Sequence, residues 1–367
     1  VVTTGQFTQP ATEYVANLEQ NNDPHHIELI DGEDLREIAD DVGLDLYNGR
    51  IEILCDETLR PYDPAASVTA PIEEVIGDIQ NIEATDLPTP HAAVTFQPVV
   101  EVTAETNAVF ETSVGVIHRI NERTQFVVHA DRGSPRVADS DVAELVSENL
   151  NATVDLDDDS VREPFDEVTD QRFGQTETEY KDWAVEQLQR AQTTTVTYTG
   201  DNNVTYNKTC EPSRSDISVQ SIEAVYVPAV RQRTDLGGYS YPYEYHAAGP
   251  SRVTTEDGFH RCVHCEVSGD DADYTYCENC GAIACGDHIR TERLTGDPVC
   301  TGCAVTDRFA LKTKYFYDEE NLDAFREAYS EMGPLEKATE NPTVAGGGLL
   351  VVLILVGVTL FLLGGGL

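Results

Sequence analysis

The residues most capable of chemistry in this 367-residue chain lie between residues 262 and 303. Seven cysteines and one histidine form four pairs there, and two residues separate the members of each pair. The eight residues are Cys262, Cys265, Cys277, Cys280, Cys285, His288, Cys300 and Cys303. A two-residue spacer lets one tight turn present both side chains to one ion, with each sulfur about 2.3 Å from zinc. The spacing therefore predicts two Zn2+ ions with four ligands each.

Disulfides are the alternative to zinc, but seven thiols are an odd number and His288 would then have no role. One shell of four cysteines and one of three cysteines plus a histidine leave no coordination position open to water or substrate. Both ions are therefore expected to be structural, because they would supply folding free energy to a segment with few core residues. No residue of the chain is predicted to be catalytic.

Two ways of pairing the ligands fit the spacing. Sequential ribbons would give the first two pairs to one ion and the last two pairs to the other. An interleaved cross-brace would instead join the first pair with the third and the second pair with the fourth. We favour the cross-brace, whose ligand order resembles that of RING and FYVE modules. That resemblance is confined to this zinc region and implies nothing about ubiquitin or lipid chemistry.

The chain is strongly acidic. The net charge is -42, with 66 acidic residues against 24 basic ones, and the acids are spread along the chain up to residue 340. This distribution resembles the acidic surfaces of proteins from halophilic archaea. In molar salt the Debye length falls to about 3 Å, so that the charge then says little about partners.

The last residues, 344–367, are apolar or glycine except for Thr359. Such a run is long enough to cross about 30 Å of hydrocarbon as a helix, and its inserted core is expected to be residues 349–363. Arg326 and Lys337 precede the run and no charged residue follows it. The chain starts without the pattern of a signal peptide, and zinc-binding thiolates suit a reducing compartment. We predict a single-pass membrane anchor with the bulk of the chain in the cytoplasm.

Residues 1–58 have the pattern of a partial α/β unit. Strands are expected at 1–4, 26–30 and 50–55, and helices are expected to follow the first two of them. Alternating strands and helices predict a parallel sheet, which needs further strands to be buried on both faces.

This segment resembles the closing part of an Mrr-type restriction endonuclease domain. In that family a strand ending in Thr-Thr leads through a Phe-Thr turn to a helix, and an Ile-Asp-Gly strand end opens the last helix. The matching residues are Val2, Thr3, Thr4, Phe7, Thr8, Ala11, Ile27, Leu29, Ile30, Asp31, Gly32 and Leu35. The resemblance implies DNA as a partner and DNA restriction as the function; the alternative is a membrane-tethered zinc scaffold or interaction protein.

The family's catalytic Asp and Gln/Glu-x-Lys residues are absent from the matching part of this chain. In the family they lie on strands that precede the Thr-Thr strand, and Mg2+ is expected only if such a segment lies upstream of Val1. Residues 1–55 contain no lysine. The Glu179-Tyr180-Lys181 sequence is interpreted as a chance match that opens a helix.

Residues 59–90 are expected to be a linker and residues 91–250 an α+β region. Three strands are predicted between 92 and 130, with turns at 105–107 and 121–123. Helices are expected at 141–150 and 179–191, followed by a second group of strands between 193 and 245. The alternating Tyr239, Tyr241, Tyr243 and Tyr245 favour a packed sheet face over a base-stacking surface.

A two-zinc module is assigned to 251–315, an amphipathic helix with its linker to 316–343, and the transmembrane helix to 344–367. Together with the preceding segments, this predicts a multidomain α+β chain with a partial restriction-endonuclease-like unit at its N-terminus. Basic residues concentrate around the zinc ligands, and this is the place where phosphate contacts are most plausible. The candidate nucleic-acid contacts are Arg261, Arg290, Arg293, Lys312 and Lys314.

Overall fold

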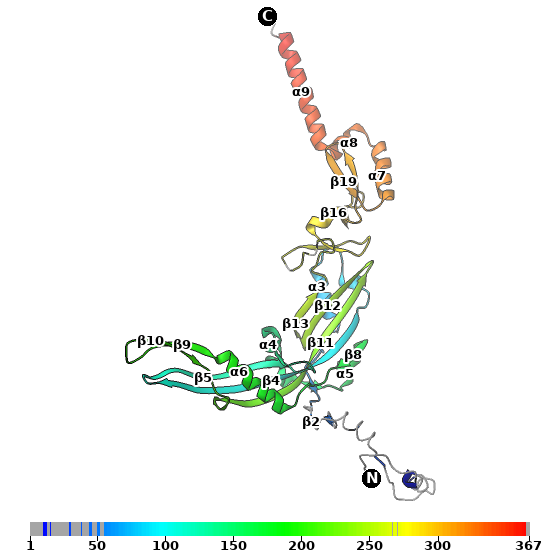
Figure 1. The fold of residues 1–367 in the computed structure, drawn as a ribbon. Helices are drawn as coiled ribbons and strands as arrows, with labels where there is room; N and C mark the ends of the chain where they lie inside the picture. The colour runs from blue at the N-terminus through cyan, green and yellow to red at the C-terminus, as the bar shows by residue number, and fades with distance from the viewer. Residues whose placement is uncertain are drawn as a thin grey trace. The chain divides into compact units, whose positions relative to one another are not determined.

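The computed structural model describes residues 55–364 except 266 and 270, together with positions 10–12, 15, 29–30, 38, 44–45 and 50–51 (Figure 1). Most of the predicted N-terminal unit, including the strand at 1–4 and most residues of its helices, lies outside the described residues. Near its end, β1 (Leu44–Asp45) pairs antiparallel with β2 (Arg50–Ile51). The parallel sheet and the likeness to Mrr-type domains therefore stay predictions.

The chain forms two compact units. The first unit comprises Val1–Ala65, Ala93–Val230 and Tyr245–Val253, and the second comprises Ala66–Ala92, Arg231–Glu244 and Thr254–Leu367. Residues 66–92 and 231–244 thus belong to the same unit as the predicted metal ligands. Two boundaries between these units, at 92–93 and 253–254, lie close to the predicted domain limits at 90 and 250, but the second unit also includes residues 231–244.

The largest sheet is mixed and has nine strands, which agrees with the predicted α+β class. Its main path is β13-β12-β11-β4-β5-β6; β3 pairs with β11 and β7, and β8 pairs with β4. The strands are β3 (Glu57–Thr58), β4 (His91–Thr112), β5 (Gly115–His129), β6 (Arg136–Val137), β7 (Val154–Asp155), β8 (Glu167–Asp170), β11 (Ile217–Leu236), β12 (Tyr239–Ala248) and β13 (Ser251–Asp257). The pairings β3–β11 and β4–β8 are parallel, whereas β4–β5 is antiparallel.

Strands β4 and β5 correct the predicted turns. Three strands are expected between 92 and 130, but the structure has two long strands joined at residues 113–114. The two predicted turns lie opposite each other in the ladder, with Glu105 paired to Arg123 and Asn107 paired to Asn121. Polar residues on an exposed strand face imitate turn signals in the sequence. Here the opposite charges of Glu105 and Arg123 favour the cross-strand pairing instead.

The helices of the first unit cover two parts of this sheet. Those predicted at 141–150 and 179–191 are confirmed as α4 (Ser140–Asn149) and α6 (Glu177–Gln192). Val142, Leu145 and Val146 of α4 pack with buried residues of β4, β5 and β11, and Leu188 of α6 packs with Ala104 and Ile217. The remaining elements are η2 (Leu150–Ala152), α5 (Asp159–Arg162), the hairpin β9 (Thr194–Thr199) and β10 (Thr205–Cys210), and η3 (Arg214–Asp216).

The Glu179-Tyr180-Lys181 sequence has a structural role at the start of α6. Glu179 and Thr176 form a capping box, in which the Thr176 amide donates to the Glu179 carboxylate at 2.9 Å. Tyr180 donates to the carbonyl of Ala130 at 2.7 Å, and Lys181 pairs with Glu177 one turn earlier. Helix capping, a buried hydrogen bond and an ion pair therefore account for the three side chains.

In the second unit, the predicted linker 59–90 instead contains a buried helix, α3 (Ala70–Gly77), followed by η1 (Ala84–Asp86). Pro71 lies in the first turn of α3, where a missing amide hydrogen costs no hydrogen bond. Ile72, Val75 and Ile76 are buried. Pro61 and Pro64 therefore precede a helix, and Pro71 lies in its first turn, where the sequence predicts a linker.

Short hairpins make up the ligand-bearing part of the second unit. They are β14 (Tyr274–Tyr276) with β15 (Ile283–Cys285), β16 (Ile289–Thr291) with β17 (Pro298–Cys300), and β18 (Val305–Phe309) with β19 (Lys312–Phe316); η4 (Gly286–His288) lies between the first two hairpins. The amphipathic helix predicted within residues 316–343 is confirmed as α7 (Glu319–Glu331). Its Leu322 and Phe325 form a small core with Phe316.

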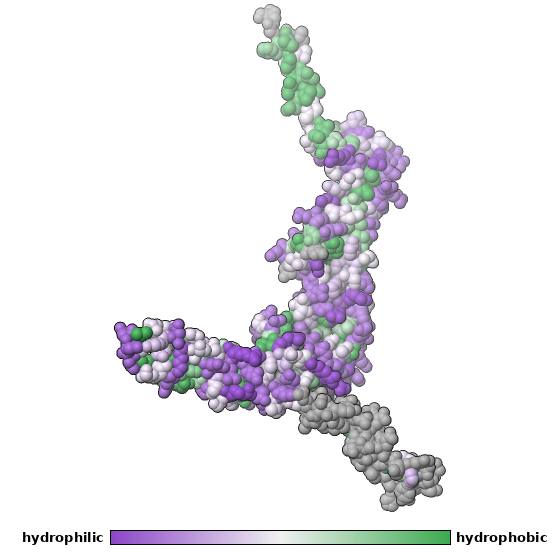
Figure 2. Space-filling view, viewed as in Figure 1, coloured by the Kyte–Doolittle hydropathy of each residue, from purple (hydrophilic) through white to green (hydrophobic). Residues whose placement is uncertain are grey.

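Two further helices continue the second unit, α8 (Pro334–Glu340) and α9 (Pro342–Gly364). Within the described residues, α9 is the one helix long and apolar enough to cross a membrane, over Pro342–Leu362. Figure 2 shows most of its surface as hydrophobic, with paler stretches between. None of its most apolar stretch is buried against protein, unlike the core helix of a soluble domain.

Candidate metal centre

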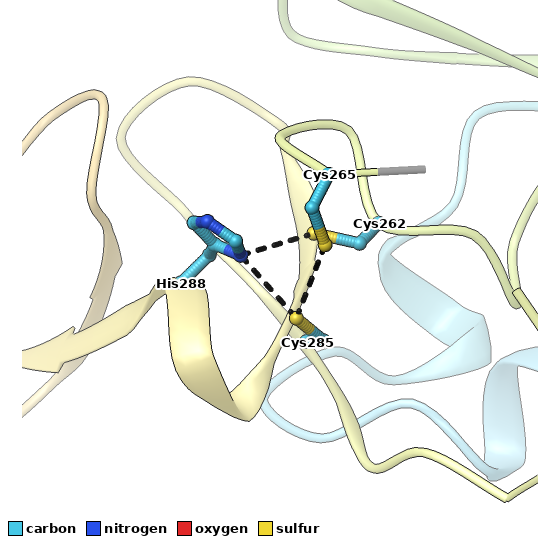
Figure 3. Close-up of side chains that lie close together, drawn as sticks. All are labelled: Cys262, Cys265, Cys285 and His288. Atoms are coloured by element: carbon cyan, nitrogen blue, oxygen red, sulfur yellow. Dashed lines mark hydrogen bonds between the residues drawn. The ribbon is translucent and has the colours of Figure 1, made fainter. Parts of the chain in front are cut away.

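The eight predicted ligands converge in two groups of four. Cys262, Cys265, Cys285 and His288 form the first group, in which all ligand atoms lie within 4.8 Å of one another (Figure 3). The Sγ atoms of Cys265 and Cys285 are 3.7 Å apart, and His288 Nδ1 is 3.4 Å from Cys285 Sγ. Four ligands around a zinc ion at about 2.3 Å would have sulfur atoms roughly 3.8 Å apart. The group therefore has the size of a tetrahedral shell.

The second group consists of Cys277, Cys280, Cys300 and Cys303, again within 4.8 Å of one another. Cys280 Sγ and Cys300 Sγ are 3.6 Å apart. Of the two pairings left open by the spacing, the structure has the interleaved one, with the first pair joined to the third and the second to the fourth. Within the described residues, these are the two groups of three or more Cys, His, Asp or Glu side chains close enough to share an ion.

Tight turns shape the ligand pairs. In the second pair, the amide of Gly281 donates to Cys277 O at 2.8 Å and that of Cys277 donates to Ala282 O at 2.8 Å. Gly281 has φ +83°, and a Cβ at this position would lie 2.0 Å from Leu236 O. Glycine is therefore required there. In the fourth pair the amides of Cys303 and Ala304 both donate to Cys300 O at 3.0 Å.

The individual cysteine thiols of these groups differ in pKa. Burial opposes ionisation of Cys262, but backbone amides, that of Cys285 first, outweigh it and lower its pKa to about 7. Burial raises the pKa of Cys285 and of Cys300 to about 11. Several buried thiolates so close together repel one another unless a cation lies between them. A metal ion would therefore displace the remaining protons and bind more tightly as pH rises.

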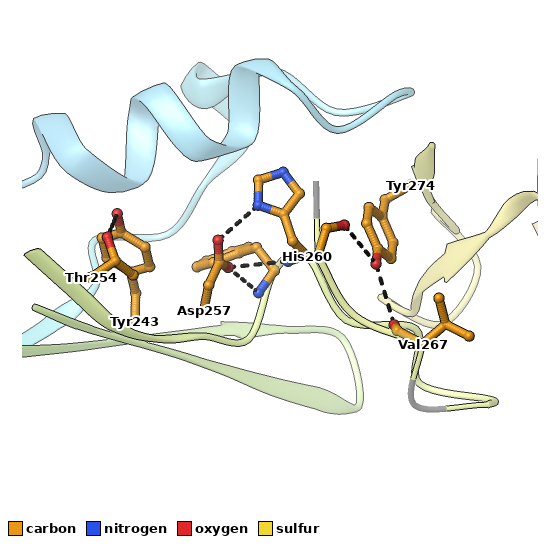
Figure 4. Close-up of polar contacts among 8 residues, drawn as sticks. Tyr243, Thr254, Asp257, His260, Val267 and Tyr274 are labelled. Carbon is orange, nitrogen blue, oxygen red and sulfur yellow. Dashed lines mark hydrogen bonds and ion pairs between the residues drawn. The ribbon is translucent and has the colours of Figure 1, made fainter. Parts of the chain in front are cut away.

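Hydrogen bonds hold the residues that precede and follow the first ligand pair in the sequence (Figure 4). Asp257 accepts hydrogen bonds from the amides of Phe259 at 2.8 Å and His260 at 3.1 Å, and its second oxygen lies 2.7 Å from His260 Nδ1. Tyr274 donates to Val267 O at 3.3 Å and stacks obliquely with His260. The loop that bears Cys262 and Cys265 is thus held from both sides.

The tyrosine row on β12 connects this strand to the ligand-bearing hairpins through Tyr241. Tyr241, Tyr243 and Tyr245 are each 2% exposed, so the row forms a packed sheet face, as its alternation indicated. Tyr241 donates to Gly281 O and accepts from the amide of Ile283, both at 2.7 Å. Burial raises the pKa of Tyr241 well above its ordinary value. No local sequence signal predicts this contact, because about 40 residues separate its partners.

Several of the candidate nucleic-acid contacts have partners within the second unit. Arg293 and Lys314 both pair with Glu340, with Lys314 Nζ 3.0 Å from its carboxylate. Arg290 donates to Ile289 O at 2.6 Å and lies over the Tyr315 ring at 5.4 Å. Arg261 forms a β-bridge with Ser268, and Lys312 begins β19. Sequence reasoning missed Glu340, which the acidic background hides.

No known protein family, no characterised protein and no solved structure matches this chain.

Proposed function

We propose that the chain is a non-enzymatic scaffold or interaction protein, stiffened by two structural zinc ions and tethered to a membrane by α9. The observation that supports this most directly is the composition of the two ligand groups. Each contains four Cys or His side chains, which fill a tetrahedral shell and leave no position for a reacting water. Catalytic zinc sites keep one such position open.

Ion pairs support a mechanical link between the ligand-bearing hairpins and the anchor. Glu340 is the last residue of α8, and only Asn341 separates it from α9. Its carboxylate pairs with Arg293 and Lys314. The side chains of Glu340 and Lys314 are only 17% and 11% exposed. Such half-buried pairs are less screened by salt than exposed ones. A force on α9 would therefore be passed to the hairpins through side chains as well as through the peptide chain.

The proposed orientation places the bulk of the chain in the cytoplasm. Lys337 and Arg326 lie on the N-terminal side of α9, and the described cysteines form no disulfide. Free thiols suit a reducing compartment. Positive residues beside a membrane helix favour the cytoplasmic side.

The full-length chain in membranes, kept in molar KCl, tests this proposal. We expect two zinc ions per chain by elemental analysis, and we expect a strong chelator to make residues 251–315 sensitive to protease while the chain stays in the membrane. Cys210→Ser lies outside both groups and is the matched control, which should keep both ions. A chain that binds no zinc, or one whose protease resistance is unchanged by the chelator, would contradict a structural role for the metal.

A second proposal, DNA binding and restriction, is supported by the residues between Val2 and Leu35 that resemble Mrr-type domains. Plasmid DNA, methylated and unmethylated, should be incubated with the full-length chain and Mg2+ across a range of KCl concentrations. Binding that weakens steeply with salt would favour the DNA-binding part of this proposal. Cleavage that needs Mg2+ would favour restriction as well, and would mean that residues other than the family's missing catalytic ones carry it. Absence of binding even at low salt would leave the scaffold as the better description.

A further inference from the structure

Three exposed leucines of the second unit lie close to α8, the element that leads into α9. Leu311 is 80% exposed in the turn between β18 and β19, and Leu335 is 81% exposed in the first turn of α8. Leu294, which is 43% exposed, lies between β16 and β17. A single exposed leucine needs no explanation, but three around one element form a distinctive surface. We call these residues the leucine rim.

Contacts of the neighbouring residues place the rim at one end of the unit. Arg293, next to Leu294, pairs with Glu340 at the end of α8. Phe309, two residues before Leu311, contacts Tyr329 with ring centroids 4.0 Å apart. Lys337 of α8 lies over the same Tyr329 ring, 5.2 Å from its centroid. All three leucines therefore lie within a few residues of side chains that meet at α8 and the C-terminal turn of α7.

The turn that carries Leu311 has an unusual backbone. Ala310 adopts φ +51°, a left-handed conformation that costs a residue with a Cβ about 1 kcal/mol or more. Glycine would avoid that cost. The sequence nevertheless places alanine and then a largely exposed leucine at this tip, so both turn residues are apolar.

The distance from α8 to the hydrocarbon is short. Residues 342–349 rise about 12 Å as a helix, at roughly 1.5 Å per residue. The polar layer on each side of the hydrocarbon core is about 5–8 Å thick. The end of the unit at α8 therefore lies about 4–7 Å from the outer edge of the headgroups when residues 349–363 are inserted.

We propose that the leucine rim inserts into the interface of the bilayer that α9 crosses, so that the hairpins and α7 rest on the membrane surface. This inference rests on the proposed membrane anchor and adds a second contact with lipid. The occupant is the bilayer itself, because the rim adjoins the helix that enters it. Seating in this way limits the swing of the unit about the single residue, Asn341, that separates α8 from α9.

Tryptophan fluorescence of the full-length chain in vesicles tests the proposal. The chain has one tryptophan, Trp183, and the Trp183→Phe variant provides a dark background. Leu311→Trp and Leu335→Trp are made separately in that background and reconstituted into vesicles containing lipids brominated near the headgroup. The matched control is Val267→Trp, at a loop position of the same unit that is 48% exposed and whose described hydrogen bonds to the ligand loop are made by its backbone carbonyl. Each variant must retain the metal content of the unmodified chain.

We expect the Leu311→Trp and Leu335→Trp variants to be quenched at least twofold more strongly than Val267→Trp and to emit at shorter wavelength. Equal quenching at all three positions, or none at any, overturns the leucine rim. Vesicle flotation reports on the anchor separately. A chain that floats without quenching contradicts this inference alone, whereas a chain that fails to float contradicts the proposed membrane tether.

Discussion

The hydroxyl of Tyr241 lies 2.7 Å from the amide nitrogen of Ile283, and this contact fixes the hairpin of β14 and β15 to a strand that precedes it in the sequence. The same oxygen donates to Gly281 O at 2.7 Å. One side chain thereby satisfies two backbone groups on either side of Ala282. Both groups belong to the segment between Cys280 and Cys285, so the contact spans the connection between the two metal groups.

Tyr241→Phe should destabilise the second unit by about 1–3 kcal/mol, because a buried amide and a buried carbonyl would each lose a partner. The ligands themselves are untouched, so the chain should still bind the same number of zinc ions. Denaturant unfolding of the full-length chain in detergent measures the change. Tyr239→Phe is the control: no hydrogen bond is described for its hydroxyl, and its effect should stay within about 0.5 kcal/mol.

Pairs of ligand substitutions distinguish the interleaved arrangement from sequential ribbons. Cys262→Ser with His288→Ala removes two ligands from one group and should leave one ion per chain. Cys262→Ser with Cys277→Ser removes one ligand from each group and should leave none. Sequential ribbons would reverse the two results. Metal content by elemental analysis decides between them, with Cys55→Ser plus Cys210→Ser as the control pair that should lose no ion.

Deleting residues 349–367 should release the chain from membranes, because those residues contain the segment expected to be inserted. The leucine rim alone would give weak and reversible association, which dilution removes. Fractionation in molar KCl measures the outcome. If the truncated chain still sediments with membranes after washing, a different part of the chain holds it there.

The ligand spacing predicted both the identity of the metal ligands and, through the short gap between Cys280 and Cys285, the possibility of interleaving. These features depend on local geometry, which sequence carries directly. The turns within β4 and β5 could not be placed, because Asn107 and Asn121 are equally good turn residues and exposed strand residues. Glu340 and Tyr241 could not be assigned either. Their partners are far away in the chain, and one acid among 66 gives no local signal.

Glu340→Gln should weaken the attachment of α8 by about 2 kcal/mol, because Lys314 and Arg293 would lose their shared counter-ion while Lys314 stays largely buried. Arg293 first, and then Lys314, hold the pKa of Glu340 below its ordinary value of 4.5. A carboxyl with a lowered folded-state pKa stabilises the fold above that ordinary value and loses its contribution as pH falls through the lowered one. The difference in unfolding free energy between the unmodified chain and Glu340→Gln should therefore be constant near neutrality and shrink below pH 4.5.

Glu331→Gln, an exposed acid at the end of α7, should change stability by no more than about 0.5 kcal/mol. A difference that persists unchanged into acid would mean that the ion pairs do not stabilise this junction.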